Sequence, residues 1–472
     1  MINNLVVLIP EIFLIISICI ILMIGVFSKN SYNFIVKSTI AILILTIILI
    51  LNSNDETVIK IFSESFVSSK YTIFLKVLIS LSSIFVINSS QIFIKENKIS
   101  KFEYPIIILL SILGMFFMVS ANDLILFYLG LELQSLSLYI LASIDRENIK
   151  STESGIKYFI LSALSSGLLL YGCSLLYGFT GSTNFEIIGS KLTTTNVGAI
   201  FAMVFILVGL AFKISAVPFH MWAPDVYEGS PTTVTLFFTM VPKIAALTVF
   251  IRFLYVPFIN MMDQWQPIII FLSIASMIFG AIAAIGQKNL KRLIAYSSIG
   301  HIGYALAGLS VGTNEGLQSS IVYLSIYIVM NLGFFSCLLM MKKNDLYFET
   351  IEDLSGLSKN HPILSLCFLI VLFSLAGIPP LAGFFAKFYI FKSVIEQSMY
   401  FLAIVGLLST VIAAFYYLRI IKVIYFDEQR EKYDTDHSNW LKVSLTLSTL
   451  LILLYFIFPS KLLEIVSSIN VI

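Results

Sequence analysis

The hydrophobic positions of this chain form long runs, most of them close to the about 20 residues that an α-helix needs to cross a bilayer. Short polar segments separate the runs, so the pattern predicts about fourteen transmembrane helices and an all-α polytopic membrane protein. The predicted helices lie at 5–27, 34–51, 72–94, 105–121, 123–143, 155–178, 196–217, 232–254, 267–286, 291–310, 316–341, 361–396, 400–420 and 441–458. Very short turns join the pairs at 105–143 and 267–310, which we therefore expect to be antiparallel neighbours.

Two of the predicted helices carry a proline break, and their sequences, VGLAFKISAVPFHMW (208–222) and FSLAGIPPLAGFFAK (373–387), align without gaps. The aligned strings share Leu210/Leu375, Ala211/Ala376 and Phe219/Phe384. Each is the fourth helix of a five-helix block, helices 4–8 and 9–13. Because five is odd, the second block enters the membrane from the opposite side, and such inverted repeats with interrupted helices are typical of transporters. The predicted parts are three N-terminal helices in 1–104, the first repeat in 105–254, the second, inverted repeat in 255–425, and a C-terminal helix in 426–472.

The composition indicates a membrane protein and excludes several other classes. The chain is 58% hydrophobic and 12% charged, with a mean hydropathy of +0.96, whereas soluble domains carry about 25% charged residues. A net charge of +2 without a long basic run gives no sign of a nucleic-acid partner. No glycine-rich nucleotide motif occurs and the four cysteines form no C-x-x-C pair, so the residues predict neither cofactor nor metal in this chain. Glu11 interrupts the first apolar run and no basic residue precedes it, which argues against a cleaved signal peptide.

Lysine and arginine predict the orientation, because they concentrate in loops on the inner side of the membrane. With the N-terminus outside, the inner loops and their flanks hold most of the 29 lysines and arginines. The outer side then holds only Lys60, Lys70, Lys191, Arg252, Lys392 and Lys461. We therefore expect both termini on the outer, periplasmic-type side.

Ionisable residues inside the predicted helices indicate an ion path. Lys213 lies within the first interrupted helix, where a charge costs about 2.5–3.5 kcal/mol on insertion scales, and Pro218 breaks that helix five residues later. Glu132 is near the middle of the fifth helix, Lys243 near the middle of the eighth, and Lys387 follows the second break. Such residues at membrane depth mark proton or ion pathways. The alternative is a buried Glu132–Lys213 ion pair without a transport role, which leaves two lysines unexplained.

Three further residues are candidate relays. Lys157 is near the inner end of the sixth helix, where it either snorkels to the headgroups or joins the path. His301 in the tenth helix and His220 after the first break are able to exchange protons near neutral pH, with a satisfied core histidine as the competing interpretation. Residues expected only to snorkel or to be solvated are Lys76, His361 and His437.

Several strings identify a family. The segments KYFILSALSSGLLLYGCSLLYGFTGST, KISAVPFHMWAPDVYEGSPTTVT and IPPLAGFFAKFYIF, with LIPEI near the start, resemble the subunit N family (subunit 2 in mitochondria) of proton-pumping NADH:quinone oxidoreductase, respiratory complex I. The resemblance spans essentially the whole chain, and the wider family includes the antiporter-like subunits L and M and the Mrp-type sodium/proton antiporters. It implies that Glu132, Lys213, Lys243 and Lys387 are the glutamate and lysines of a proton path. Lysine at position 387 separates the chain from subunit M, where the family usually has glutamate.

The resemblance also implies a setting. It implies an antiporter-like, non-redox subunit that couples electron transfer in other subunits to proton translocation, with NADH, FMN, iron–sulfur clusters and quinone carried by those subunits. Other membrane-arm subunits and the lipid bilayer are the expected partners, and a bacterial inner membrane, or else an organellar inner membrane, is the expected location. Two alternatives stay open: a subunit of an Mrp-type cation/proton antiporter, and a passive scaffold whose charges only lock helices together.

Overall fold

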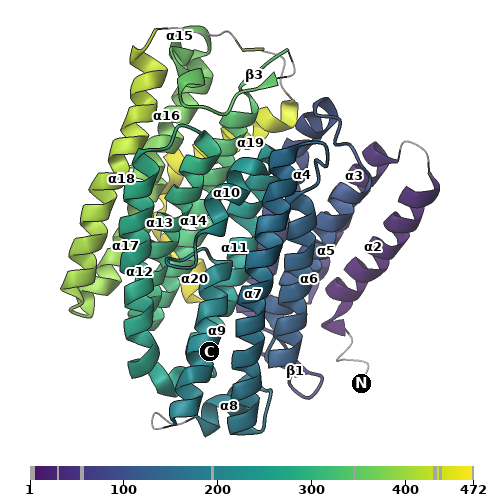
Figure 1. Cartoon of the computed structure of the whole chain (residues 1–472), viewed down its shortest axis with the longest axis vertical. Coiled ribbons are helices and arrows are strands. Elements are labelled where there is room, and N and C mark those ends of the chain that lie inside the picture. The colour runs from purple at the N-terminus through teal and green to yellow at the C-terminus, as the bar shows by residue number, and fades with distance from the viewer. Residues whose placement is uncertain are drawn as a thin grey trace.

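The computed structural model describes residues 6–28, 31–53, 58–192, 196–344, 346–428, 433–434 and 438–469. In this part of the chain the protein is a bundle of long helices (Figure 1). The uninterrupted membrane-crossing helices are α2 (Ile9–Phe27), α3 (Tyr32–Asn52), α4 (Lys70–Glu96), α5 (Glu103–Ser120), α6 (Leu124–Ala142), α7 (Ile149–Thr180), α11 (Thr232–Tyr255), α12 (Met262–Ile285), α13 (Leu290–Ser310), α14 (Asn314–Leu339), α18 (Tyr400–Phe426) and α19 (Asn439–Leu454).

Two further crossings are interrupted. The helix α9 (Val197–Lys213) is followed by α10 (Trp222–Gly229), and α16 (Pro362–Ala376) is followed by α17 (Ala382–Glu396). The twelve uninterrupted and two interrupted crossings within the described ranges lie where the hydrophobic runs placed them, and eleven helices are long and apolar enough by themselves to span a bilayer. The predicted all-α membrane fold with one broken helix in each five-helix block is confirmed.

Short elements lie at the two ends of the bundle (Figure 1). At one end are the antiparallel strands β1 (Ile59–Ile61) and β2 (Phe66–Ser68), with Ile59 opposite Ser68, and the helix α8 (Phe185–Lys191). At the other end are the paired strands β3 (Lys342–Lys343) and β4 (Leu346–Tyr347) and the helix α15 (Leu357–Asn360). The remaining short pieces are the 3-10 turns Ile259–Met261, Glu352–Leu354 and Tyr455–Ile457 and the helix α20 (Pro459–Ser467).

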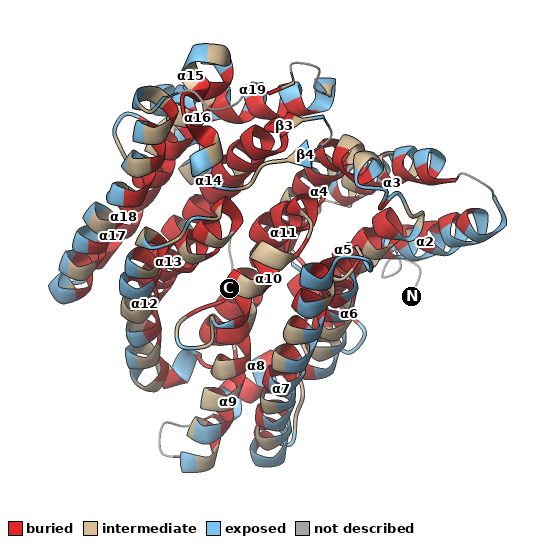
Figure 2. Ribbon diagram, turned by 45° about the horizontal axis from the view of Figure 1, so that its top comes forward, coloured by how far each residue is buried: buried red, intermediate tan, exposed pale blue. Residues whose placement is uncertain are grey.

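The helices α11 and α14 form the centre of the bundle. Every residue of α11 is buried, and so are nearly all of those of α14; Figure 2 shows α11 as a red ribbon between partly exposed neighbours. At the edges, α2, α3 and α18 expose apolar side chains such as Ile16, Leu45 and Val411, as lipid-facing helices do. A lysine on α11 is therefore held well away from lipid.

The two helix pairs predicted to be antiparallel neighbours pack backbone against backbone. A Cβ atom added at Gly114 of α5 would lie 2.6 Å from the backbone nitrogen of Gln134 in α6. One added at Gly280 of α12 would lie 2.6 Å from the backbone nitrogen of Gly300 in α13. Small residues permit this close approach of membrane helices. The prediction is confirmed, and the same kind of contact occurs in both five-helix blocks.

Each break satisfies its freed backbone groups within the protein. After α9, Ser215 has a φ of 63°, and after α16, Gly377 has a φ of 88°. The Val217 N–H donates to Ser276 Oγ of α12 at 2.9 Å, and the Gly383 N–H donates to Ser374 Oγ at 3.0 Å. Non-helical backbone at membrane depth requires such partners. Because Ser276 belongs to the second block, the first break is held partly by that block.

Lys76 does not reach the headgroups, and the prediction that it snorkels is wrong. Its side chain is 5% exposed, and its Nζ lies 2.6 Å from Glu11 Oε1. The ammonium also lies over the rings of Phe66 at 4.9 Å and Phe116 at 5.7 Å. The counter-charge is Glu11 of α2. Nothing in the sequence indicated this pair, because the two residues are 65 positions apart. This buried ion pair ties α2 to α4.

Candidate functional site

Lys213 ends α9 inside the bundle, among hydroxyl groups. Its Nζ donates to Ser135 Oγ of α6 at 2.8 Å and to Ser162 Oγ of α7 at 2.7 Å. Tyr139 donates its hydroxyl to the same Ser162 Oγ at 2.6 Å. The C-terminal end of a helix favours a positive charge. Lys213 is thus held by neutral acceptors and by the helix end.

Glu132 and Lys213 do not form an ion pair in the described structure, where the Lys213 ammonium is bound by Ser135 and Ser162. Glu132 lies on α6 one turn before Ser135, and its Oε1 atom is buried without a hydrogen-bond partner. An unpartnered buried carboxylate oxygen is costly and unusual. The alternative of a static Glu132–Lys213 ion pair is therefore wrong for this conformation.

Lys243 occupies the centre of α11 with no carboxylate within ion-pair distance among the residues the structure describes. It is 2% exposed and donates to Ser298 Oγ of α13. Its ammonium also lies over the rings of Tyr227 at 5.8 Å and Tyr327 at 5.7 Å. The Lys243 ammonium is thus stabilised by a hydroxyl and by aromatic rings, and not by a carboxylate.

His301 connects the region of Lys243 with that of Lys387. Its Nδ1 is 2.6 Å from the Tyr323 hydroxyl and its Nε2 is 3.2 Å from the Tyr417 hydroxyl. The ring lies 4.9 Å from that of Tyr327, which also faces Lys243. Both nitrogens are therefore hydrogen-bonded to groups that are able to pass a proton on.

Lys387 reaches back across the second break. Its Nζ donates to Ala376 O at 2.9 Å and to Leu375 O at 3.3 Å, the last carbonyls of α16, and lies 5.0 Å from the centre of the Tyr304 ring. The Tyr304 hydroxyl is in turn 3.0 Å from Ser409 Oγ. Lys387 also lines a cavity of about 470 Å³. The other residues along that cavity are mostly apolar, and they are Gly377, Phe384, Phe388, Phe391, Ile395 and Leu407, with Lys392, Glu396 and Thr410.

Aromatic residues fill the interval between Lys213 and Lys243. The Tyr139 ring lies 4.9 Å from that of Tyr158, and Tyr158 stacks on Trp222 at 4.4 Å. Trp222 meets Tyr227 at 6.2 Å, and Tyr227 faces Lys243. The polar groups around Lys213, Lys243, His301 and Lys387 thus form a series of separate hydrogen-bonded clusters, with aromatic ring contacts between those of Lys213 and Lys243. Lys243 and Lys387 are buried, and none of the three lysines sits in an isolated apolar pocket.

Sequence reasoning missed the serines and tyrosines of this series. A helical spacing was available as a signal on α13, where Ser298, His301 and Tyr304 recur every third residue and share one face. Tyr323 and Tyr327 likewise share a face of α14, four residues apart, but only tertiary packing brings them to His301.

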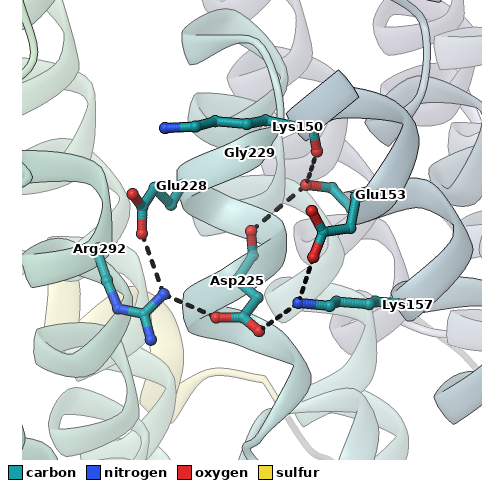
Figure 3. Close-up of a pocket in the computed structure, with 8 residues that line it drawn as sticks. Lys150, Glu153, Lys157, Asp225, Glu228, Gly229 and Arg292 are labelled. Atoms are coloured by element: carbon teal, nitrogen blue, oxygen red, sulfur yellow. Dashed lines mark hydrogen bonds and ion pairs between the residues drawn. The ribbon is translucent and has the colours of Figure 1, made fainter. Parts of the chain in front are cut away.

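Lys157 lies near the N-terminal end of α7, in a small charged pocket (Figure 3). Its Nζ is 2.7 Å from Glu153 Oε1 and 3.0 Å from Asp225 Oδ2. Arg292 of α13 contacts the same Asp225 at 2.7 Å and Glu228 at 3.0 Å. The Lys157 side chain is 43% exposed, so it is neither buried in the path nor simply snorkelling.

The other histidines lie apart from the series. The ring of His220 packs against Phe279 at 4.5 Å, and its Nδ1 has no hydrogen-bond partner. His361, expected to be only solvated, is half-buried in the loop before α16 and accepts a hydrogen bond from the Tyr433 N–H at 3.3 Å; burial lowers the pKa of its imidazole. His437 lies outside the described residues. In the described part of the chain no cluster of three or more His, Cys, Asp or Glu residues is placed to hold a metal ion.

Comparisons with known proteins agree with this architecture. The model of the family described as NADH:quinone oxidoreductase/Mrp antiporter, TM, matches residues 121–413. NADH-quinone oxidoreductase subunit N of Pelagibacter ubique is 70% identical over 470 residues, covering 100% of both chains. The protein of the same name from Parvibaculum lavamentivorans is 49% identical over 457 residues, covering 96% of this chain and 94% of the relative.

Solved structures share the fold. A chain in the structure of respiratory complex I from Thermus thermophilus with bound aureothin is 27% identical, with a TM-score of 0.85 over 98% of this chain and 100% of that one. A chain of the Mrp complex from a Dietzia species has a TM-score of 0.86 at 20% identity, over 98% of this chain and 97% of that one, and indicates the fold alone. The chain therefore belongs to the NADH:quinone oxidoreductase/Mrp antiporter family and, within it, to the subunit N group.

Proposed function

We propose that this chain is the antiporter-like, proton-translocating subunit N of an NADH:quinone oxidoreductase and that it carries protons along Glu132, Lys213, Lys243, His301 and Lys387. The observation that supports this proposal is the series of hydroxyl, imidazole and ammonium clusters through the centre of the bundle. Ionisable groups in a membrane interior that line up in this way serve proton relays. The chain performs no redox chemistry itself; NADH, FMN, iron–sulfur clusters and quinone belong to other subunits.

The proposed switch is a movement of Lys213 between two sets of partners. In this conformation Ser135 and Ser162 hold the ammonium while Glu132 keeps an unpartnered oxygen. Contact with Glu132 stabilises the charged lysine, and contact with the neutral serines does so less. Moving one proton against 100 mV requires about 2.3 kcal/mol, which corresponds to a change of about two pKa units. A lysine that alternates between a carboxylate and two hydroxyls supplies a change of that size.

In the proposed route, protons enter from the inner side near Lys157 and load Lys243. They pass by Ser298, Tyr327 and His301 to the region of Lys387. They leave through the cavity of about 470 Å³ that Lys387 lines. His220 has no place in this route, because its ring faces Phe279.

The setting follows the same proposal. The chain sits in a bacterial inner membrane with both termini on the outer side, beside other membrane-arm subunits of the complex. Residues 105–254 and 255–425 act as the two inverted repeats, flanked by 1–104 and 426–472. The 70% identity to a subunit N favours this assembly over an Mrp-type antiporter.

Substitution of the central lysines tests the route. In the assembled complex, Lys213→Ala and Lys243→Ala are expected to lower quinone-linked proton pumping several-fold, because each removes a proton-binding group from the series. Lys422→Ala is the control, since that side chain is 66% exposed at the end of α18. Wild-type pumping in both central variants would eliminate the route. Sodium-dependent transport without NADH oxidation would instead favour the antiporter assembly.

A further inference from the structure

The half-helix α10 is held at the inner mouth between the two five-helix blocks. On one side is α7 of the first block, and on the other is α13 of the second. Figure 3 shows Asp225 of α10 between Arg292 and Lys157, with Glu153 beside Lys157. These residues line a pocket of about 170 Å³ at the place where the proposed proton route begins.

The ion pairs on the two sides of α10 are unequal. On the side of α13, Arg292 contacts both Asp225 at 2.7 Å and Glu228 at 3.0 Å, and Lys291 donates to the backbone oxygen of Ser230, just after α10, at 3.0 Å. Toward α7, the ion pair is Lys157 with Asp225 at 3.0 Å; Ser154 Oγ also donates to Asp225 O at 3.4 Å, and Trp222 of α10 stacks on Tyr158 of α7 at 4.4 Å. Disruption of the Lys157–Asp225 pair therefore removes the charge contact with α7 and leaves neutral contacts there, while the ion pairs with α13 remain.

Lys157 has a second carboxylate partner on its own helix. Glu153, one turn earlier, lies 2.7 Å from the same ammonium. When Lys157 leaves Asp225 it therefore keeps an ion pair, so the exchange leaves no charge without a partner. Part-exposed ion pairs of this kind contribute little to stability and break readily. Gly229 completes the contact, because a Cβ there would lie 2.6 Å from the Lys150 backbone oxygen of α7.

We propose that Lys157 is the movable latch of an inner gate: bound to Asp225 it closes α10 against α7, and bound to Glu153 alone it lets α10 move away with α13. The latch rests on the proposed proton route and regulates its entrance. Asp225 and Lys157 act as positioning residues that control access to the mouth. Because Asp225 also binds Arg292, the gate connects the first block to the second.

Two variants of equal charge change test the latch in opposite directions. A cysteine at Ser154, which lines the pocket and is 2% exposed, reports access through its rate of reaction with a charged thiol reagent added from the inner side. In the complex reconstituted into sealed vesicles of known orientation, Asp225→Asn leaves Lys157 on Glu153 and is expected to raise this rate about threefold or more, as for loss of a part-exposed pair. Glu153→Gln leaves Lys157 on Asp225 and is expected to lower the rate and to slow proton pumping.

Controls separate the latch from general effects of charge. Lys150→Met removes a charge from the same pocket, and Lys150 forms no side-chain ion pair among the described residues, so it should leave the rate unchanged. The chain that retains Ser154 gives the background from Cys19 and Cys367. Equal or same-direction effects of the two carboxylate variants would overturn the latch and leave the route standing. Opposite effects together with wild-type pumping by Lys213→Ala and Lys243→Ala would support the gate and reject the route.

Discussion

At the scale of single residues, the buried lysines have two kinds of partner. Lys76 has a carboxylate partner, Glu11, at 2.6 Å. Lys243 and Lys387 instead meet hydroxyl, carbonyl and aromatic groups. A paired charge is held in its charged form, whereas a desolvated lysine among neutral groups releases its proton more readily. The presence or absence of a carboxylate thus distinguishes Lys76 from the two lysines of the proposed route.

The Glu11–Lys76 pair gives a prediction at this scale. Lys76→Met leaves Glu11 buried without a counter-charge and is expected to cost about 3–5 kcal/mol of stability. The double variant Glu11→Leu/Lys76→Met is expected to recover most of it, because an apolar pair replaces the two charges. The measurement is thermal stability of the purified complex.

The control for that experiment is Lys60→Met. Lys60 pairs with Glu186 at the surface, where the two side chains are 31% and 44% exposed. Such pairs contribute about 0–1 kcal/mol. Equal losses of stability in Lys60→Met and Lys76→Met would show that burial of the Glu11–Lys76 pair does not increase the cost of breaking it.

At the scale of elements, close glycine contacts join the helices within each block. The helix α12 approaches the backbone of α13 at Gly280, as α5 approaches α6 at Gly114. These contacts set the position of α13, which carries Ser298 and His301. A change in the distance between α12 and α13 should therefore move Ser298 and His301 of the proposed route without substituting either residue.

Gly280→Ala and Gly300→Ala form a matched pair for this idea. A Cβ at Gly280 would lie 2.6 Å from a backbone nitrogen of α13, whereas one at Gly300 meets nothing within 4 Å beyond its own helix. We expect Gly280→Ala to destabilise by about 1–3 kcal/mol through overpacking and to slow pumping. Gly300→Ala should be neutral or slightly stabilising, since alanine favours helix. Comparable stability of the two variants in a thermal assay would contradict the close contact.

At the scale of the whole molecule, the proposed proton route begins and ends at pockets lined by different helices. The charged pocket at α7, α10 and α13 includes Lys150, and the cavity beside Lys387 includes Lys392. The route requires these openings to face opposite sides of the membrane. The lysine bias of the loops predicts that the first faces the inner side and the second the outer side.

Sidedness is directly measurable. In sealed vesicles of known orientation, Lys150→Cys is expected to react with an impermeant thiol reagent only from the inner side and Lys392→Cys only from the outer side. Both are exposed positions, so neither change should affect assembly. Reaction of both from one side would refute the orientation and the direction of transport.

Much of the fold was predictable because each membrane helix is encoded by one short, continuous stretch of sequence. A run of about 20 apolar residues defines a crossing, and lysines or prolines inside it stand out against that background. The candidate lysines, Glu132 and His301 were found in this way. The partners of Lys76 and Lys157 were not, because Glu11 and Asp225 lie far along the chain from them.

The sequence by itself determined the number of crossings, the two broken helices and the presence of charges at membrane depth, since each depends on a short stretch of chain in a hydrocarbon solvent. Only the tertiary structure decided which charges have counter-charges, which hydroxyls join the lysines, and that Asp225 bridges two blocks. Those contacts depend on packing between helices far apart in sequence, and the hydropathy pattern does not indicate which helix faces pack against each other.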